Sequence, residues 1–267
     1  MPATDHSSLN RDTPWVIAGT IGFLAVLIIL GGRAAGLWRP AAAPQLAPGF
    51  LLRSMDFAGE TNRYAVWVPP SARAGAAVPA SMPLIVFLHG SAEAGRDGIL
   101  PTAVGLGPAL NIAPDRWPAL ALFPQIKPGE QWTDRTELLF ATIEAAAKDF
   151  PVDRARISLV GLSTGGSGVW EAASQRPSLF AAIVPICAQR REIAFAAVAR
   201  VPTWIAHGQL DDVISVAESR FMIDALKAAG GNPTVTIFPD ARHEAWDPLF
   251  TDPAFAPWLL GQKLAAP

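Results

Sequence analysis

The sequence has little of several residue types on which whole classes of function depend. It contains one cysteine among 267 residues, so no disulfide can form within the chain. No cluster of cysteine and histidine has the spacing of metal ligands, and no phosphate-binding loop or dinucleotide fingerprint is present. The formal net charge is −2, which gives no basic field for nucleic acid. We therefore expect no metal, no cofactor and no nucleic-acid partner. The lone Cys187 ends an apolar run, and we expect a buried strand residue there.

A long apolar run lies near the N-terminus. Residues 15–32 carry no charge and, at about 18 positions, are long enough to cross a bilayer and long for the core of a signal peptide. We interpret them as a transmembrane helix that acts as an uncleaved signal anchor; a cleaved signal peptide and a buried N-terminal helix are the alternatives. Residues 1–14 would be a tail and the Pro/Ala-rich residues 33–52 a linker. Arginines on both sides of the run do not decide its orientation. Because such a tether suits a domain held off a membrane surface, we expect a membrane-anchored protein whose remaining domain is exported, periplasmic or extracellular.

Residues 53–267 read as one domain in which strand and helix patterns alternate. An opening hairpin is expected at 55–58 and 64–68, strands at 84–88, 119–123, 157–161, 181–186, 202–206 and 234–238, and helices at 134–148, 166–175, 190–199, 216–229 and 253–264. This alternation predicts an α/β fold with a mostly parallel central sheet and helices on both faces. The region 93–117 is rich in glycine and proline, which is typical of a lid or pocket wall.

The most informative segment joins the expected strand 157–161 to the helix after it. It reads Gly161-Leu162-Ser163-Thr164-Gly165, and a G-x-S-x-G sequence between strand and helix is typical of a sharp turn that exposes a nucleophilic serine. Glycine is needed two residues before and after Ser163 because strand and helix crowd each other there. The alternative is a glycine-rich turn with an ordinary surface serine.

A serine nucleophile needs a base, and the base needs an orienting carboxylate. Of the four histidines, His6 lies in the N-terminal tail, while His89 and His207 each end a strand before a glycine and are expected to be structural. His243 follows the expected strand 234–238 in a loop, so we predict that it is the base.

The choice of acid is open on these grounds alone. Asp211 and Asp212 are adjacent at the end of the expected strand 202–206, and only one of them can reach the histidine because successive side chains point to opposite sides. Asp240 is nearby, but its place in the same turn as His243 favours a turn-forming role.

Two further groups complete the expected site. An oxyanion needs two backbone N–H donors, which we assign to Thr164, directly after the nucleophile, and to Ser91, in the loop after the strand 84–88. Trp132 and Trp246 follow strand ends and are expected to form walls of a substrate pocket, with packing of loops at the sheet edge as the alternative.

The chain resembles the α/β-hydrolase superfamily, and most of all the esterase and predicted-peptidase branch near polyhydroxybutyrate depolymerases, feruloyl and acetyl xylan esterases and dienelactone hydrolases. The matching segments are 87–95, Phe123-Pro124-Gln125, 161–170, His207-Gly208-Gln209-Leu210-Asp211-Asp212 and 243–248. In this family the acid is the aspartate three residues after the glycine of H-G-x-x-D, which selects Asp211.

The resemblance implies a serine hydrolase of the carboxylic-ester class, with Ser163, Asp211 and His243 as its triad. Its substrate would be a small-molecule or polymeric ester. A peptidase that uses the same triad, and a non-catalytic membrane-tethered binding protein on a hydrolase scaffold, are the alternatives.

Overall fold

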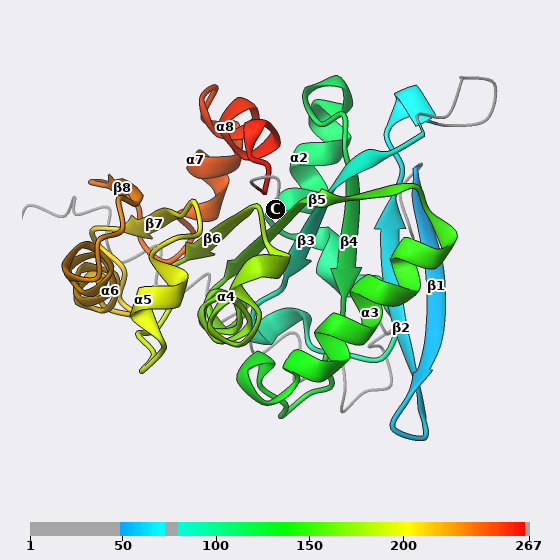
Figure 1. Cartoon of the computed structure of the whole chain (residues 1–267), viewed down its shortest axis with the longest axis horizontal. Helices are drawn as coiled ribbons and strands as arrows, with labels where there is room; N and C mark the ends of the chain where they lie inside the picture. Colours follow the sequence, from blue (N-terminus) through cyan, green and yellow to red (C-terminus); the bar gives the residue numbers. More distant parts are fainter. Residues whose placement is uncertain (1–48, 73–79, 265–267) are drawn as a thin grey trace, which may run out of the picture. The chain divides into compact units, whose positions relative to one another are not determined.

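The opening hairpin and the six later strands form one sheet of eight strands in the computed structural model (Figure 1), in the order β1-β2-β4-β3-β5-β6-β7-β8. The strands are β1 (Phe50–Phe57), β2 (Glu60–Trp67), β3 (Met82–Leu88), β4 (Leu120–Pro124), β5 (Val152–Leu162), β6 (Ala182–Ile186), β7 (Trp204–Gly208) and β8 (Thr234–Phe238). β1 pairs antiparallel with β2 and β2 pairs antiparallel with β4, while the neighbours from β4 through β3 to β8 are all parallel. The predicted α/β class with a mostly parallel sheet is confirmed.

The structure describes residues 49–72 and 80–264, which fall in the unit Gln45–Pro267. The tail 1–14 and the apolar run 15–32 lie outside the described residues, as does most of the predicted linker. The hairpin begins at Phe50, so the last three residues of the range 33–52 belong to β1 rather than to a linker. Within the described ranges no helix has both the length and the hydropathy that a bilayer span requires.

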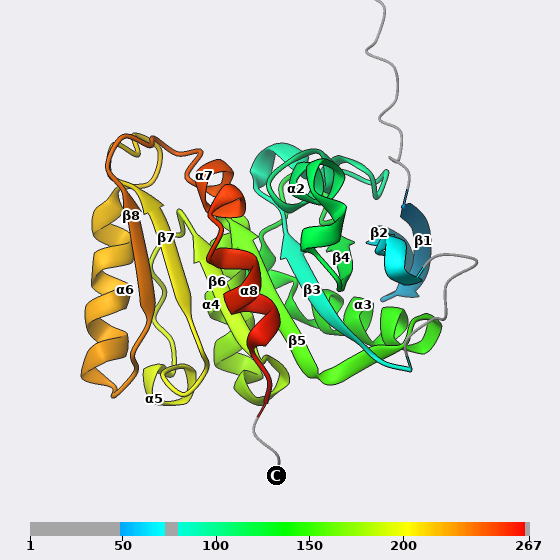
Figure 2. The same cartoon turned by 90° about the horizontal axis from the view of Figure 1, so that it is seen from above.

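Helices cover both faces of the sheet, as Figures 1 and 2 show. The α-helices are α2 (Leu106–Ile112), α3 (Thr136–Asp149), α4 (Thr164–Gln175), α5 (Phe195–Val198), α6 (Val216–Ala228), α7 (Trp246–Thr251) and α8 (Phe255–Gly261). Short 3-10 turns lie at Pro70–Ala72, Ser91–Glu93, Leu100–Ala103, Pro114–Arg116, Trp132–Asp134 and Pro177–Leu179. Side chains from α3, α4, α5 and α6 pack on one face, and those from α2, α7 and α8 pack on the other.

The central strands β3, β4 and β6 are apolar along their whole length because both of their faces are buried. In β3, Leu84, Val86 and Leu88 join the core under α3 and α4. Ile85 and Phe87 alternate with them and join the core under α2, α7 and α8. Because successive side chains of β3 point to opposite faces of the sheet, one apolar run contributes to both hydrophobic cores.

One predicted helix is much shorter in the structure. The range 190–199 was expected to be helical, but only α5 at its end forms. In the part of this range that is not helical, backbone N–H groups donate hydrogen bonds to side chains instead. The N–H of Arg190 donates to Glu218 Oε2 at 3.1 Å, that of Arg191 to Met222 Sδ at 3.4 Å and that of Ala194 to Ser174 Oγ at 3.1 Å. These tertiary bonds from α6 and α4 replace the helical ladder.

Neighbouring strands of the sheet share the fewest paired residues between β6 and β7. This pair shares one register position, Ile186 opposite Ala206, together with an isolated bridge between Ile183 and Thr203. By contrast, β7 and β8 pair over five consecutive positions. This junction therefore divides the sheet into a larger part, β1 to β6, and a smaller part made of β7 and β8.

Candidate active site

Ser163 occupies a strained turn between β5 and α4. Its φ of 54° and ψ of −121° lie where non-glycine residues rarely occur, at a typical cost of about 1–3 kcal/mol. The predicted crowding is present: an ideal Cβ on Gly161 would lie 2.5 Å from the Gly165 carbonyl oxygen, and one on Gly165 would lie 2.2 Å from the Leu88 carbonyl oxygen. The Ser163 N–H donates to the Ile186 carbonyl at 2.8 Å, which ties the turn to β6.

Three side chains from three strand ends meet at the carboxyl edge of the sheet. The His243 Nε2 atom lies 3.0 Å from Ser163 Oγ, and His243 Nδ1 lies 2.8 Å from Asp211 Oδ2. Asp211 follows β7, and His243 follows β8. The structure thus joins the three residues into one hydrogen-bonded series. The Asp211 side chain is fully buried, whereas that of His243 is 13% exposed and can be reached from outside.

The Asp211 carboxylate is held by four donors. Oδ1 accepts from the Val213 and Ile214 N–H groups at 2.9 and 2.8 Å, and Oδ2 accepts from His243 and from His207 Nε2, the latter at 3.0 Å. Burial alone would raise the pKa of Asp211, but the bonds from His243, Ile214 and Val213 outweigh it and leave the pKa below its ordinary value. The group is therefore an anion beside the imidazole.

The alternative acids lie elsewhere. Asp212 is exposed and forms an ion pair with Arg242 Nη1 at 2.6 Å. Asp240 is exposed in the turn after β8. Of the three aspartates considered, the structure brings only Asp211 to His243.

The two predicted oxyanion donors flank the serine. Thr164 is the first residue of α4, and Ser91 begins the short turn Ser91–Glu93 after β3. Within the described residues neither N–H has a hydrogen-bond acceptor. The loop lies against the strained turn, because an ideal Cβ on Gly90 would be 3.6 Å from Ser163 Cβ and 2.9 Å from Leu162 Cδ1. Two free donors are thus available close to the nucleophile.

The two tryptophans differ in their placement. Trp246 is half-buried at the start of α7, and its ring meets the His243 ring edge-to-face at 5.4 Å. Trp132 does not line a pocket as predicted, because it is 1% exposed and its Nε1–H donates to the His89 carbonyl at 3.0 Å. An ideal Cβ on Gly168 of α4 would lie 2.4 Å from Trp132 Cβ, so Trp132 packs closely against α4 at Gly168.

Two residues near the site were given no functional role from the sequence. His207 was expected to be structural, yet it touches the Asp211 carboxylate; its place four residues before Asp211 was the available signal. Gln125 was noted only as part of a motif, and it bonds to the loop that carries Ser91.

A group of potential metal ligands lies behind the triad. Cys187, His207 and Asp211 place ligand atoms within 4.8 Å of one another. Burial raises the pKa of the Cys187 thiol to about 12, so it stays protonated, and Asp211 Oδ2 is already shared by two imidazoles. These contacts suit support of the carboxylate better than binding of an ion.

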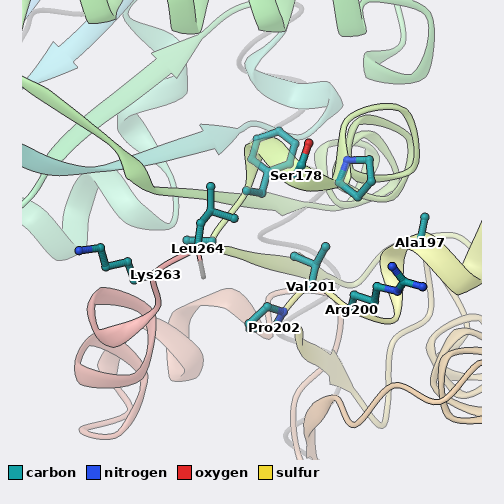
Figure 3. Close-up of a pocket in the computed structure, with 10 residues that line it drawn as sticks. Ser178, Ala197, Arg200, Val201, Pro202, Lys263 and Leu264 are labelled. Atoms are coloured by element: carbon teal, nitrogen blue, oxygen red, sulfur yellow. The ribbon is translucent and has the colours of Figure 1, made fainter. Parts of the chain in front are cut away.

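A separate cavity lies at the opposite edge of the sheet. Its volume is about 600 Å³, and Phe180 is among the residues that line it. Figure 3 shows Arg200, Val201, Lys263 and Leu264 around the hollow. Phe180 and Val201 precede β6 and β7, which puts the cavity at the amino-terminal ends of these strands. It has no part in the Ser163 site.

Comparison with known proteins finds similarity to hydrolases. A family model described as PETase, PET hydrolase-like, matches residues 134–229, which include Ser163 and Asp211 and end before His243. The crystal structure of a thermostable esterase superposes with a TM-score of 0.69 at 27% identity over 80% of this chain. The chain has the α/β-hydrolase fold and is similar to esterases of this fold. This α/β-hydrolase spans 63% of that esterase's chain.

More distant structures share the α/β-hydrolase fold. The feruloyl esterase module from Clostridium thermocellum, crystallised with sinapinate, has a TM-score of 0.66 at 14% identity and covers 86% of this chain and 95% of its own. An acylaminoacyl peptidase has a TM-score of 0.60 at 15% identity and covers 81% of this chain and 42% of its own. No curated protein matches the sequence. The structures that share this fold thus include esterases and peptidases.

Proposed function

We propose that this α/β-hydrolase cleaves carboxylic esters through an acyl-enzyme formed on Ser163. The observation that carries the proposal is the continuous series from Ser163 Oγ through the His243 imidazole to the Asp211 carboxylate, with both distances in the hydrogen-bonding range. Such a series is what converts a neutral hydroxyl into a nucleophile.

In the acylation half of the reaction, Ser163 Oγ attacks the acyl carbon and its proton passes to His243 Nε2. The imidazole gains a positive charge, which the buried Asp211 anion stabilises through Nδ1–H. His243 then gives the proton to the leaving alcohol oxygen as the C–O bond breaks, so that the acyl group remains on Ser163.

Deacylation repeats these steps with water. His243 Nε2 accepts a proton from a water molecule that attacks the acyl carbon, and it returns this proton to Ser163 Oγ as the carboxylic acid leaves. Each half passes through a tetrahedral oxyanion. The N–H groups of Ser91 and Thr164, which have no acceptor among the described residues, would donate hydrogen bonds to this oxyanion.

Apolar groups around the site support an ester with an apolar or aromatic acyl part. Trp246 stands edge-on to the His243 ring. Leu210 and Val213 flank Asp211 in the loop after β7 and are 53% and 68% exposed. Since isolated apolar side chains are common on surfaces, the weight falls on Trp246, which touches the base itself. The substrate would be a small-molecule or polymeric ester.

The test compares the full-length protein with its Ser163→Ala variant on p-nitrophenyl esters of increasing acyl length, beside a panel of short peptides. A mild detergent is included because residues 15–32 are apolar. Ester turnover that is lost in Ser163→Ala supports the proposal, and the preferred acyl length measures the pocket. Turnover of peptides alone would make the protein a peptidase, and a folded protein inert to both panels and to serine-directed phosphonates would be a binding protein.

A further inference from the structure

The loop that carries the Ser91 N–H is weakly bonded within itself. Between Gly90 and Gly98, the internal bonds of its first turn run from Glu93 N to the Gly90 carbonyl and from Ala94 N to the Ser91 carbonyl, both at 3.4 Å. These lengths lie beyond the usual range for N–H···O bonds. The position of a donor in such a loop must therefore be fixed by contacts from outside it.

The Gln125 side chain supplies these contacts. Its Nε2 donates to the Glu93 carbonyl at 2.9 Å, and its Oε1 accepts from the Gly98 N–H at 2.7 Å. Gln125 follows β4 directly and is 5% exposed. One buried amide thus uses both its donor and its acceptor to hold two loop positions that are five residues apart.

The backbone approaches this amide closely. An ideal Cβ on Gly95 would lie 2.4 Å from Gln125 Nε2, so a side chain at position 95 would displace the amide from its present place. The Gly95 N–H donates to the Ile126 carbonyl at 2.8 Å, and the Ile126 N–H donates to His89 Nε2 at 3.2 Å. The loop is therefore joined to the end of β4 on both sides of Ser91.

We propose that Gln125 is a positioning residue, which holds the Ser91 N–H where the oxyanion forms. The inference rests on the proposed esterase function. Gln125 acts through the loop that it binds, so its contribution is made in the transition state rather than in binding of the ester. Loss of the amide leaves the Glu93 carbonyl and the Gly98 N–H without partners and frees the loop to move.

The decisive variant is Gln125→Met in the full-length protein, because methionine fills a similar volume without a hydrogen-bonding amide. We expect kcat on p-nitrophenyl butyrate to fall by about 10- to 100-fold with KM nearly unchanged, somewhat less than removal of an oxyanion donor outright. The inhibition constant of phenylboronic acid, whose tetrahedral adduct on serine places an oxygen in the same position, should rise by a similar factor. Rates are expressed per reactive serine, counted by titration with a phosphonate, so that loss of folded protein does not enter.

Gln175→Met is the matched control. The Gln175 amide also bonds on both sides, accepting from Thr136 Oγ1 at 2.8 Å and donating to Glu171 Oε1 at 3.0 Å, but it lies at the far end of α4 from Ser163. Its variant should keep the kcat and the boronate affinity of the wild type. An equal loss in both variants would overturn the inference, since general loosening of the fold would then explain it.

The outcomes separate the inference from the proposed function. Normal turnover and boronate affinity per reactive serine in Gln125→Met would overturn the positioning role and leave the esterase function intact. No ester turnover in the wild type would overturn both. If Gln125→Met does not fold, Gln125→Glu replaces it, because this variant keeps the acceptor for the Gly98 N–H and places a carboxylate oxygen, which repels the Glu93 carbonyl oxygen, where the donor was; the same losses are then expected.

Discussion

His207 and His243 share one carboxylate oxygen of Asp211. His207 Nε2 lies 3.0 Å from Asp211 Oδ2, and His243 Nδ1 lies 2.8 Å from the same atom. His207 Nε2 also lies 2.8 Å from the Ile214 carbonyl oxygen. Because this oxygen and Asp211 Oδ2 are both acceptors, Nε2 must carry the proton. Its Nδ1 then accepts from the Ser219 hydroxyl at 2.7 Å. Burial lowers the pKa of His207, which keeps it a neutral donor.

Replacement of His207 should therefore change the behaviour of the triad as well as stability. In His207→Phe, Asp211 loses one donor and the Ser219 hydroxyl loses its acceptor, at a cost of about 1–3 kcal/mol. Since the carboxylate charge then acts more fully on the His243 imidazolium, the acid limb of the kcat/KM profile should move to higher pH. His207→Gln retains an amide N–H near Nε2 and should move it less. Identical pH profiles in all three proteins would show that His207 only packs.

Asp211 and Asp212 should differ greatly in their importance. Asp211→Asn keeps the shape of the site but removes the anion that fixes the His243 tautomer, a change that costs about 10⁴-fold in kcat in other triads. Asp212→Asn breaks only the exposed pair with Arg242, worth less than about 1 kcal/mol of stability, and kcat should stay within about twofold. Steady-state kinetics on one p-nitrophenyl ester decide the matter, and a severe Asp212→Asn would refute the assignment of the acid.

Gly165 should tolerate no side chain. The Cβ of Gly165→Ala would meet the Leu88 carbonyl oxygen at 2.2 Å and the His89 carbonyl oxygen at 2.6 Å, and backbone atoms cannot yield as a side chain can. We expect a loss of about 1–3 kcal/mol or more in the free energy of unfolding, together with loss of turnover. Gly261→Ala at the end of α8 is the control: it meets nothing within 4 Å and should be neutral or slightly stabilising. Urea unfolding of both variants measures the difference.

The buried His89 predicts a dependence of stability on pH. Burial lowers its pKa to about 4, from an unfolded value of about 6.5. Between these values the unfolded chain binds a proton that the folded protein does not, so stability is full above about pH 6.5 and is lost as the pH falls toward 4. The shift corresponds to about 3 kcal/mol. His207, whose pKa is also lowered, adds to the same trend.

Denaturant unfolding at pH 7, 5.5 and 4.5 measures this slope, and His89→Asn is the informative variant. Its amide can still donate to the Gly90 carbonyl, which His89 Nδ1 contacts at 2.6 Å, but it does not titrate. The slope should be smaller in this variant than in the wild type. An unchanged slope would mean that other groups govern acid stability.

The sequence predicted the strands and the meeting of the triad for a physical reason. Parallel strands place their carboxyl ends at one edge of a sheet, so Ser163, Asp211 and His243 had to emerge together once the strands were recognised. The juxtaposition is present in the structure, while the catalytic roles remain predictions that await kinetics. The choice between Asp211 and Asp212 came from the family resemblance, because strand geometry alone allows either.

Features that depend on tertiary contacts were beyond the sequence. Residues 190–199 have helical composition, but their N–H groups are bound by α4 and α6. Trp132 looked like a pocket wall because it follows a strand end, and only its bond to the His89 carbonyl reveals a buried wedge. The double contact of Gln125 depends on the fold of a loop 27 to 32 residues earlier in the chain, which no local pattern encodes.

The short pairing of β6 with β7 lies between two groups of the proposed catalytic residues. The nucleophile and both oxyanion donors belong to the β3–β5 side of this seam, while the acid and base belong to β7 and β8. A small rotation about the seam would lengthen the gap between Ser163 Oγ and His243 Nε2 and leave each half internally intact. On warming, we therefore expect turnover to be lost at a lower temperature than helical structure. The temperature of half-inactivation would then reflect the short pairing of β6 with β7 and not the unfolding of the two hydrophobic cores.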